Sequence, residues 1–246
     1  MPTTIEWTNE TWNPTSGCTQ VSSGCDNCYA LRFAERFRGT RGHYYERGFD
    51  VTIRPKMLER PRRWHTPRLV FVNSMSDLFH VDIPDDYIDQ VFSVISAHPQ
   101  HTFQLLTKRA ERMRRYIRSR FSDAAMPSNL WLGVSVEDNA ASWRVPMLLE
   151  TRPAVRFLSV EPMIGPVDRV ALEGVSWVIA GGESGPRHRS MDPRWVRDLR
   201  DRCVALGVPF FFKQWHKGET GRLLDGRTWD EMPSHSAAGT LETTGT

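Results

Sequence analysis

Three of the four cysteines in the chain fall within one stretch of eleven residues. Cys18, Cys25 and Cys28 are spaced C-x6-C-x2-C, and Gly17 and Gly24 each stand immediately before a cysteine. Glycine lets the backbone adopt positive φ angles, so both glycines would allow the loop to bend around a small, dense object. We predict that this loop binds a metal centre around which the rest of the chain is arranged.

The second half of the loop leads into a helical pattern. Tyr29, Phe33, Ala34 and Phe37 recur at helical spacing, and the pattern stops at Gly39. The N-terminus of a helix favours negative charge, so we expect the cysteine thiols of this loop to lose their protons easily.

The number of cysteines bears on which metal is bound. A structural zinc ion takes four protein ligands, whereas three cysteines leave one position open. A 4Fe-4S cluster held by three cysteines, with one iron free for a small molecule, fits the count better. His43 and His65 could complete a zinc site through a long loop, so zinc is an alternative. A redox-sensitive loop without metal is the other alternative. Cysteine clusters in reducing compartments are seldom disulfides, which favours a metal site.

Length and composition favour one packed α/β domain. The chain has 246 residues, 39% of them hydrophobic and 11% aromatic, which supports a folded core rather than disorder. No apolar run approaches the roughly 20 residues of a membrane span, and the first residues lack the features of a signal peptide. We therefore expect a cytoplasmic protein without membrane association.

Hydrophobic patterning predicts strands that alternate with helices. The expected strands are 3–7, 68–73, 102–107, 130–136, 155–160, 175–180 and 208–213. The expected helices are 29–39, 84–98 capped by Asp82, 109–120, 139–150 disturbed at Pro146, and 193–206. Such alternation is typical of parallel βαβ units. It predicts a partial β/α barrel of six or seven parallel strands, with a doubly wound open sheet as the alternative.

The last helix is the most clearly marked. Asp192 is a capping residue, Pro193 suits the first turn and Gly207 suits the end. Cys203 lies on its apolar face and is expected in the core rather than at the metal. The single domain is expected to cover 1–233, with a terminal hairpin turning at Asp225-Gly226. A disordered tail is expected over 234–246.

Polar or ionisable residues follow the predicted strands. In either architecture the carboxyl ends of the strands form the site. The charged residues that are poor helix caps are Lys108, Glu137, Glu161, Glu183 and Lys213. Lys108, Glu137, Glu161 and Lys213 are the candidate catalytic residues, and a structural ring of ion pairs is the alternative. A hydrolase that uses Glu137 and Glu161 as an acid–base pair is a further hypothesis.

Two glycines follow the strand at 175–180. Gly181 and Gly182 would let a ligand approach the backbone, and the Glu183 carboxylate could receive an ammonium group; an ordinary turn is the alternative. Ser184 and, at another strand end, Ser135 are the remaining candidates for cofactor binding.

Basic residues are concentrated in two segments. Between Arg32 and Arg68 there are eleven Lys and Arg residues against four acids, and the helix from Lys108 to Arg120 carries seven against one. Such a surplus suggests an anionic partner, and nucleic acid is the natural candidate, with Trp64 and His65 stacking on bases. A solvated charged face is the alternative for the helix.

Several motifs together resemble a known family. They are Ile5-Glu-Trp-Thr, Thr11-Trp-Asn-Pro, the cysteine block through Tyr29-Ala30, Leu105-Leu-Thr-Lys-Arg, Gly133-Val-Ser-Val-Glu, Leu158-Ser-Val-Glu-Pro, Gly181-Gly-Glu-Ser-Gly and Phe212-Lys-Gln-Trp. Over about residues 5 to 233 the chain resembles the three-cysteine family of phages and bacterial chromosomes usually described as radical-SAM-like. The resemblance implies a partial barrel of the radical S-adenosylmethionine (SAM) type. It also implies a 4Fe-4S cluster at Cys18, Cys25 and Cys28, with Glu183 near the amino group of SAM.

The function expected from these observations is that of an iron–sulfur, radical-SAM-like enzyme acting on nucleic acid, in DNA repair or modification. The alternative is a non-catalytic nucleic-acid-binding protein whose metal is structural. The expected cofactors are the 4Fe-4S cluster and SAM, and the expected partners are nucleic acid and a protein encoded nearby.

Overall fold

Seven parallel strands form one sheet in the computed structural model, which describes residues 3–122, 124–185, 187–216 and 221–234. The strands are β1 (Glu10–Trp12), β4 (Leu69–Val72), β5 (Thr102–Thr107), β6 (Leu130–Ser135), β7 (Val155–Val160), β8 (Trp177–Gly181) and β9 (Phe210–Gln214). Every neighbouring pair is parallel, and their spatial order follows the chain from β1 to β9.

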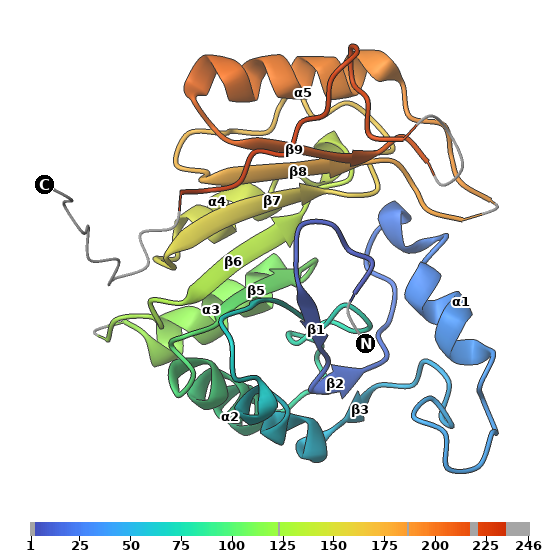
Figure 1. Ribbon diagram of the computed structural model, residues 1–246, viewed down its shortest axis with the longest axis vertical. Coiled ribbons are helices and arrows are strands. Elements are labelled where there is room, and N and C mark those ends of the chain that lie inside the picture. Colours follow the sequence, from blue (N-terminus) through green and yellow to red (C-terminus); the bar gives the residue numbers. More distant parts are fainter. Residues whose placement is uncertain (1–2, 123, 186, 217–220, 235–246) are drawn as a thin grey trace, which may run out of the picture.

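This strand order identifies the architecture. A doubly wound sheet reverses its strand order at a switch point, whereas the order here never reverses. The sheet curls with its covering helices α2 to α5 on the outside (Figure 1), and among the described residues β1 and β9 do not pair. The predicted partial β/α barrel of six or seven strands is therefore confirmed, with seven strands, and the doubly wound alternative is wrong.

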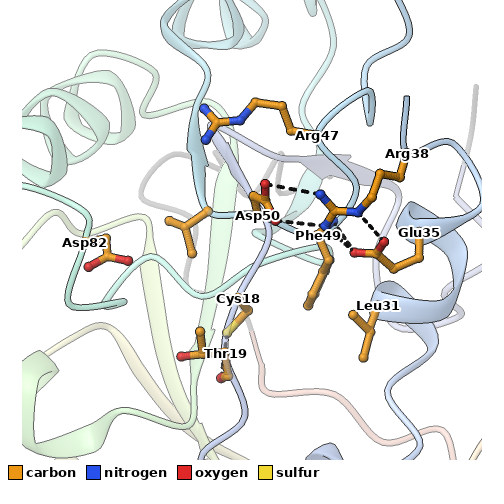
Figure 2. A pocket seen from close by; sticks show the side chains of 10 residues that line it. Cys18, Thr19, Leu31, Glu35, Arg38, Arg47, Phe49, Asp50 and Asp82 are labelled. Atoms are coloured by element: carbon orange, nitrogen blue, oxygen red, sulfur yellow. Dashed lines mark hydrogen bonds and ion pairs between the residues drawn. The ribbon is translucent and has the colours of Figure 1, made fainter. Parts of the chain in front are cut away.

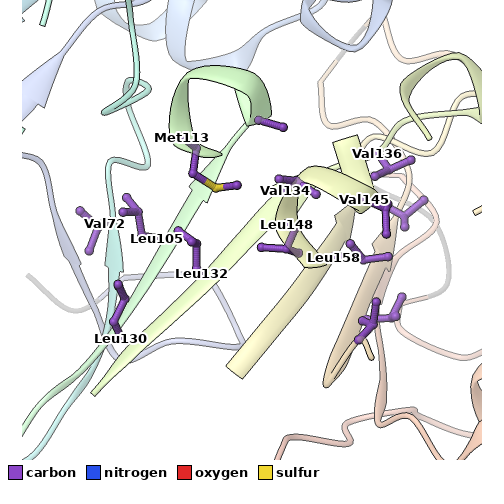
Figure 3. Close-up of a cluster of buried hydrophobic side chains, with 14 of the residues drawn as sticks. Val72, Leu105, Met113, Leu130, Leu132, Val134, Val136, Val145, Leu148 and Leu158 are labelled. Atoms are coloured by element: carbon purple, nitrogen blue, oxygen red, sulfur yellow. The ribbon is translucent and has the colours of Figure 1, made fainter. Parts of the chain in front are cut away.

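The convex face of the sheet is covered by amphipathic helices. They are α2 (Asp85–Ser96), α3 (Ala110–Arg120), α4 (Arg144–Leu149) and α5 (Pro193–Leu206), while α1 (Tyr29–Glu35) follows the cysteine loop. Figure 3 shows strand side chains such as Leu132 and Leu158 packed with Met113 of α3 and Leu148 of α4. No helix among the described residues is both long and apolar enough to span a membrane.

The concave face holds a second, aromatic core. Its members are Trp7, Phe71, Trp131, Val155, Phe157, Trp177, Ile179 and Phe211. Trp7 comes from the segment predicted as an opening strand over 3–7, which is wrong because β1 begins at Glu10. The Trp7 ring lies 4.7 Å from Phe71 and 6.1 Å from Trp177 between ring centroids, so this segment fills the concave face instead of extending the sheet.

Local sequence signals located most elements well. The strands 102–107 and 155–160 and the helix 193–206 have the predicted bounds, with the Asp192 side chain accepting from Arg194 N and Gly207 left-handed at φ 66°. At the position of the predicted hairpin turn, Leu224 and Arg227 form an isolated antiparallel bridge. The tail 235–246 lies outside the described residues.

Other boundaries differ from the prediction. Asp82 does not cap α2, whose N-cap is Pro84. The predicted helix 139–150 is divided into a short 3-10 turn, Asn139–Ala141, and α4, with Pro146 in the first turn of α4, where its missing N–H costs no helical bond. The irregular segment 40–67 contains strand β3 (Thr52–Ile53), paired with β2 (Thr15–Ser16), and the 3-10 turns η2 (Pro55–Glu59) and η3 (Pro61–Arg63).

We expect Gly133→Ala to destabilise the barrel. Gly133 is the register partner of Phe157 on the concave face, and an added Cβ would stand 2.6 Å from the Phe157 ring. Overpacking of this kind costs about 1–3 kcal/mol, which urea denaturation would measure. In a Phe157→Leu background the same substitution should cost less, because the smaller side chain leaves room; equal costs in both backgrounds would contradict the packing argument.

Candidate metal centre

The cysteine loop lies on the carboxyl ends of the strands. Its first part is attached after β4, where Gly17 N donates to Met75 O at 3.0 Å. Just beyond the loop, the Tyr29 hydroxyl donates to Ser74 O at 2.6 Å in the same β4 connection. Gly17 has a φ of 83°, and a side chain there would meet Asp50 O at 2.3 Å, so the sharp bend expected at this glycine is present.

Contacts with β6 and β8 fix the rest of the loop. The Ser22 hydroxyl donates to Glu137 Oε1 at 2.9 Å, and the Asn27 amide donates to Glu183 Oε2 at 2.9 Å. Gly24 does not have the positive φ expected from the sequence; its role is close approach, because a Cβ there would stand 2.3 Å from Glu137 Cγ. The loop is therefore seated directly on the strand ends.

The three cysteines of the loop are free thiols of intermediate exposure. Arg109 Nη2 lies 3.8 Å from Cys18 Sγ, and the Ser22 hydroxyl lies 4.0 Å from Cys25 Sγ. Within the described ranges, no three His, Cys, Asp or Glu side chains are grouped so that they could hold one metal ion. The sequence had offered His43 and His65 as further ligands of a zinc ion, and had placed Cys203 in the core. The His43 ring stacks on Phe37 at 3.9 Å, His65 is exposed, and Cys203 is buried in the core as predicted.

The expectation of an easily ionised thiol is wrong for Cys18. Burial raises its pKa to about 11, and the Asp77 carboxylate adds to the rise, although Arg109 opposes it. Cys18 lies eleven positions before the first residue of α1 and gains nothing from the start of that helix. A metal bound at Cys18 would therefore have to displace a proton.

The side chain of Arg109 contacts the first part of the cysteine loop. Its Nη2 group donates to Thr19 O at 3.1 Å and to Thr19 Oγ1 at 2.9 Å. The neighbouring Asp77 is buried and accepts from Thr107 Oγ1 at 2.8 Å and from Lys108 N at 3.1 Å. Both residues lie in the polar segments that follow β4 and β5.

Lys108 and Arg144 form an ion cluster around the buried Glu137. Glu137 is 1% exposed, its Oε1 contacts Lys108 Nζ, and its Oε2 accepts from Arg144 Nη1 at 2.9 Å. Arg144 also donates to the backbone oxygen of Ser135, at 2.8 Å. Burial alone would raise the pKa of Glu137, but Lys108, Arg144 and the hydrogen bonds outweigh it and hold that pKa below its ordinary value. No local pattern marked Arg144.

Glu161 and Lys213 form a second pair that passes over β8. Lys213 Nζ lies 2.8 Å from Glu161 Oε1. Gly181 lies between them, and a Cβ there would be 3.1 Å from Glu161 Oε1 and 3.4 Å from Lys213 Cβ. At Gly182 an added Cβ would fall 1.5 Å from Trp215 O. Packing alone therefore requires glycine at 182, whereas a side chain at 181 would only be tight against Glu161.

The Glu183 carboxylate is already paired with a cation of the chain itself. Arg189 donates to its carboxylate through the backbone N at 2.8 Å and through Nη2 at 2.7 Å, beside the Asn27 contact. Burial raises the pKa of Glu183, but Arg189 and Asn27 more than compensate, so that this pKa lies below its ordinary value. Ser184 Oγ accepts from Gln214 Nε2 at 2.7 Å.

The basic helix does not present one phosphate-binding surface. The first two basic residues of the predicted helix, Lys108 and Arg109, lie outside α3, which begins only at Ala110. They turn instead to Glu137 and the cysteine loop. Most arginines of α3 are paired with acids, in the pairs Arg112–Asp85, Arg114–Glu150, Arg118–Glu150 and Arg120–Asp89. Trp64 is 9% exposed and packs in the core, so the predicted stacking of bases on it is also wrong.

A cavity of about 480 Å3 opens beside Cys18 (Figure 2). Its walls are Cys18, Thr19, Leu31, Glu35, Arg38, Arg47, Phe49, Asp50, Val51 and Asp82. Arg38 is held by Glu35 at 2.6 Å and Asp50 at 2.8 Å, while no ion pair is found for Arg47 among the described residues. We refer to this space as the Cys18 cavity.

Comparison with known proteins places the chain in a family. The model of the family described as "Protein of unknown function (DUF5131)" matches residues 2–233. A search of curated proteins found no match. Among solved structures, the chain is similar to a mutant of spore photoproduct lyase, with a TM-score of 0.47 and 12% sequence identity. The match covers 78% of this chain and 60% of that one, so the chain spans less than two thirds of that protein's length.

We expect Glu137→Gln to lower the free energy of unfolding by about 3–5 kcal/mol at pH 7, because it leaves the buried Arg144 and the half-buried Lys108 without their carboxylate. Since the pKa of Glu137 is lowered by folding, its contribution is complete above about pH 4.3, the ordinary glutamate pKa, and is lost as the pH falls below it. Urea denaturation of both proteins across this range would measure the difference. Glu161→Gln, in a more exposed pair, is the matched control and should cost less; an equal cost would contradict the argument.

Proposed function

The chain belongs to the family described as "Protein of unknown function (DUF5131)", and we propose that it is an iron–sulfur enzyme of the radical SAM kind that acts on nucleic acid. One observation carries the proposal. Three free cysteines of a single loop are held on the carboxyl ends of a parallel β/α barrel, which is where such folds place their chemistry.

The donor set supports a cluster more than a single ion. Cys18, Cys25 and Cys28 supply three soft sulfur ligands, which suit iron–sulfur chemistry. In a 4Fe-4S cluster each thiolate binds a different iron, so the sulfurs need not converge on one point as the ligands of a zinc ion do. Arg109 beside Cys18 would offset part of the negative charge of such a group.

When bound, a cluster of this kind supplies one electron to SAM. The side chains around it would hold the cosubstrate and exclude water. The Cys18 cavity lies within the usual size range of small-molecule pockets, about 300–1,000 Å3. For Glu183 to receive the ammonium group of SAM, Arg189 must leave its carboxylate, so binding there would exchange one cation for another. Gly181, Gly182, Ser184 and Ser135 line the same strand ends.

Nucleic acid is proposed as the substrate, in a repair or modification reaction. The surplus of basic residues between Arg32 and Arg68 supports it. Arg36, Arg41, Arg47, Lys56 and Arg63 have no acid partner among the described residues, in contrast to the arginines of α3.

A second candidate is a nucleic-acid-binding protein whose metal is a structural staple. It is favoured by the internal pairing of the strand-end charges, since Glu137, Glu161 and Glu183 each have a cation of the chain itself. The geometry gives no comparable support to a hydrolase with Glu137 and Glu161 as an acid–base pair. A general base works best with a pKa near the operating pH, whereas the pKa of Glu137 is depressed.

We expect protein purified without oxygen to contain iron and sulfide, and to form 5′-deoxyadenosine from SAM when dithionite is added. Replacing Cys18, Cys25 or Cys28 with Ser should each lower the iron content severalfold. Cys203→Ser is the matched control and should keep it, because that thiol is in the core. Stoichiometric zinc without iron would contradict the proposal. Iron without SAM cleavage would favour the second candidate, in which the metal has only a structural role.

Gly24→Ala should also lower the iron content, although it changes no ligand. The added methyl group collides with Glu137 and must lift the loop from the strand ends. Ser23→Ala is the control, since the Ser23 side chain is exposed and only its backbone oxygen accepts a bond, from Arg189. Iron analysis after reconstitution would compare the two variants, and equal content would show that seating on Glu137 is not needed.

A further inference from the structure

A second pocket lies beside β1, an edge strand of the open sheet. It has a volume of about 350 Å3, and its walls are Lys56, Met57, Arg60, Arg63 and Trp64, from η2, η3 and the residues next to them. The Met57 backbone oxygen accepts from Trp12 Nε1 at 2.7 Å, which attaches this wall to the end of β1. We call it the Lys56 pocket.

The charge of the Lys56 pocket is of one sign. Three of its five lining residues are cations, and none is an acid. Arg60 donates to the buried Glu10 at 2.8 Å. Lys56 and Arg63 have no acid partner among the described residues, so two positive charges are left for a ligand. The Cys18 cavity differs, because Glu35, Asp50 and Asp82 offset its arginines.

The aromatic residue of the pocket limits what the ligand can be. Trp64 is 9% exposed. Its ring centroid lies 5.5 Å from that of His101 and 5.9 Å from Cζ of the Arg60 guanidinium. A nearly buried ring of this kind forms a wall but offers no open face on which a base could stack. The cations are therefore left to bind the phosphate groups of a nucleic acid and not its bases.

We propose that the Lys56 pocket binds the phosphate backbone of a nucleic-acid strand, without regard to sequence. This inference deepens the proposed function, since it names where the polymer is held. It requires neither the cluster nor SAM, because its residues are separate from the cysteine loop. Lys56 and Arg63 would each contact a phosphate, and Arg60 would add charge while it remains bonded to Glu10.

The test is binding of a fluorescent single-stranded DNA of about 20 nucleotides to the full chain, followed by anisotropy over a range of salt concentrations. Each phosphate contact contributes about 0.7 to the slope of log K against log salt for single strands. The variant Lys56→Ala/Arg63→Ala should lose about 1.4 of the slope and bind about tenfold more weakly at low salt. The control Arg152→Ala/Arg169→Ala removes two exposed arginines elsewhere and should leave the slope nearly unchanged.

Equal slopes in the two double variants, or no binding by the unaltered protein, would overturn the proposal. A competition with ATP distinguishes a polymer from a free nucleotide. Displacement of the DNA only at millimolar ATP supports the polymer, whereas displacement at micromolar ATP overturns it. Iron content, measured on the same samples, should be equal in all variants. A loss of the iron–sulfur cluster would therefore appear in the iron content, and a loss of phosphate binding by this pocket would appear in the salt slope.

Discussion

The contact between Gly24 and Glu137 is the constraint on which the functional end of the molecule depends. Glu137 is buried at the end of β6 with Lys108 and Arg144 around it, and a buried charge is tolerated only when it is paired and hydrogen-bonded. The cysteine loop completes this shell through the Ser22 hydroxyl, and it comes close enough only because Gly24 has no side chain. The position of the cysteines thus follows from the neutralisation of a carboxylate.

The same rule of pairing determines what the strand ends can do. Glu161 reaches Lys213 across Gly181, and Glu183 is enclosed by Arg189 and Asn27, so none of these carboxylates is left as a free acid or base. The unsatisfied chemistry of this region lies in the three thiols of the loop. A ligand at Glu183 has to compete with a cation that is already present.

Sequence reasoning succeeded where the signal was local. Helix α5 was located by Asp192, Pro193 and Gly207, since capping and the end of a helix depend on neighbouring residues. It failed where the partner was distant. Trp7 looked like part of a strand but fills the concave face, and Trp64 looked like a base-stacking residue but is buried against His101. Apolar patterning indicates that a side chain is buried, but not against which element.

By itself, the sequence determined most of the strands and helices, the parallel β/α class and the presence of three thiols in one glycine-bordered loop, because these follow from periodicity and spacing along the chain. It also located the polar strand ends. Only the tertiary structure decided that the strand order of the sheet never reverses and that Glu137 pairs with Lys108 and Arg144. It also decided that Gly181 and Gly182 lie in close contact with neighbouring residues of the chain. The physical reason is that charge pairing and close approach join residues far apart in sequence, and no local pattern records which of them will meet.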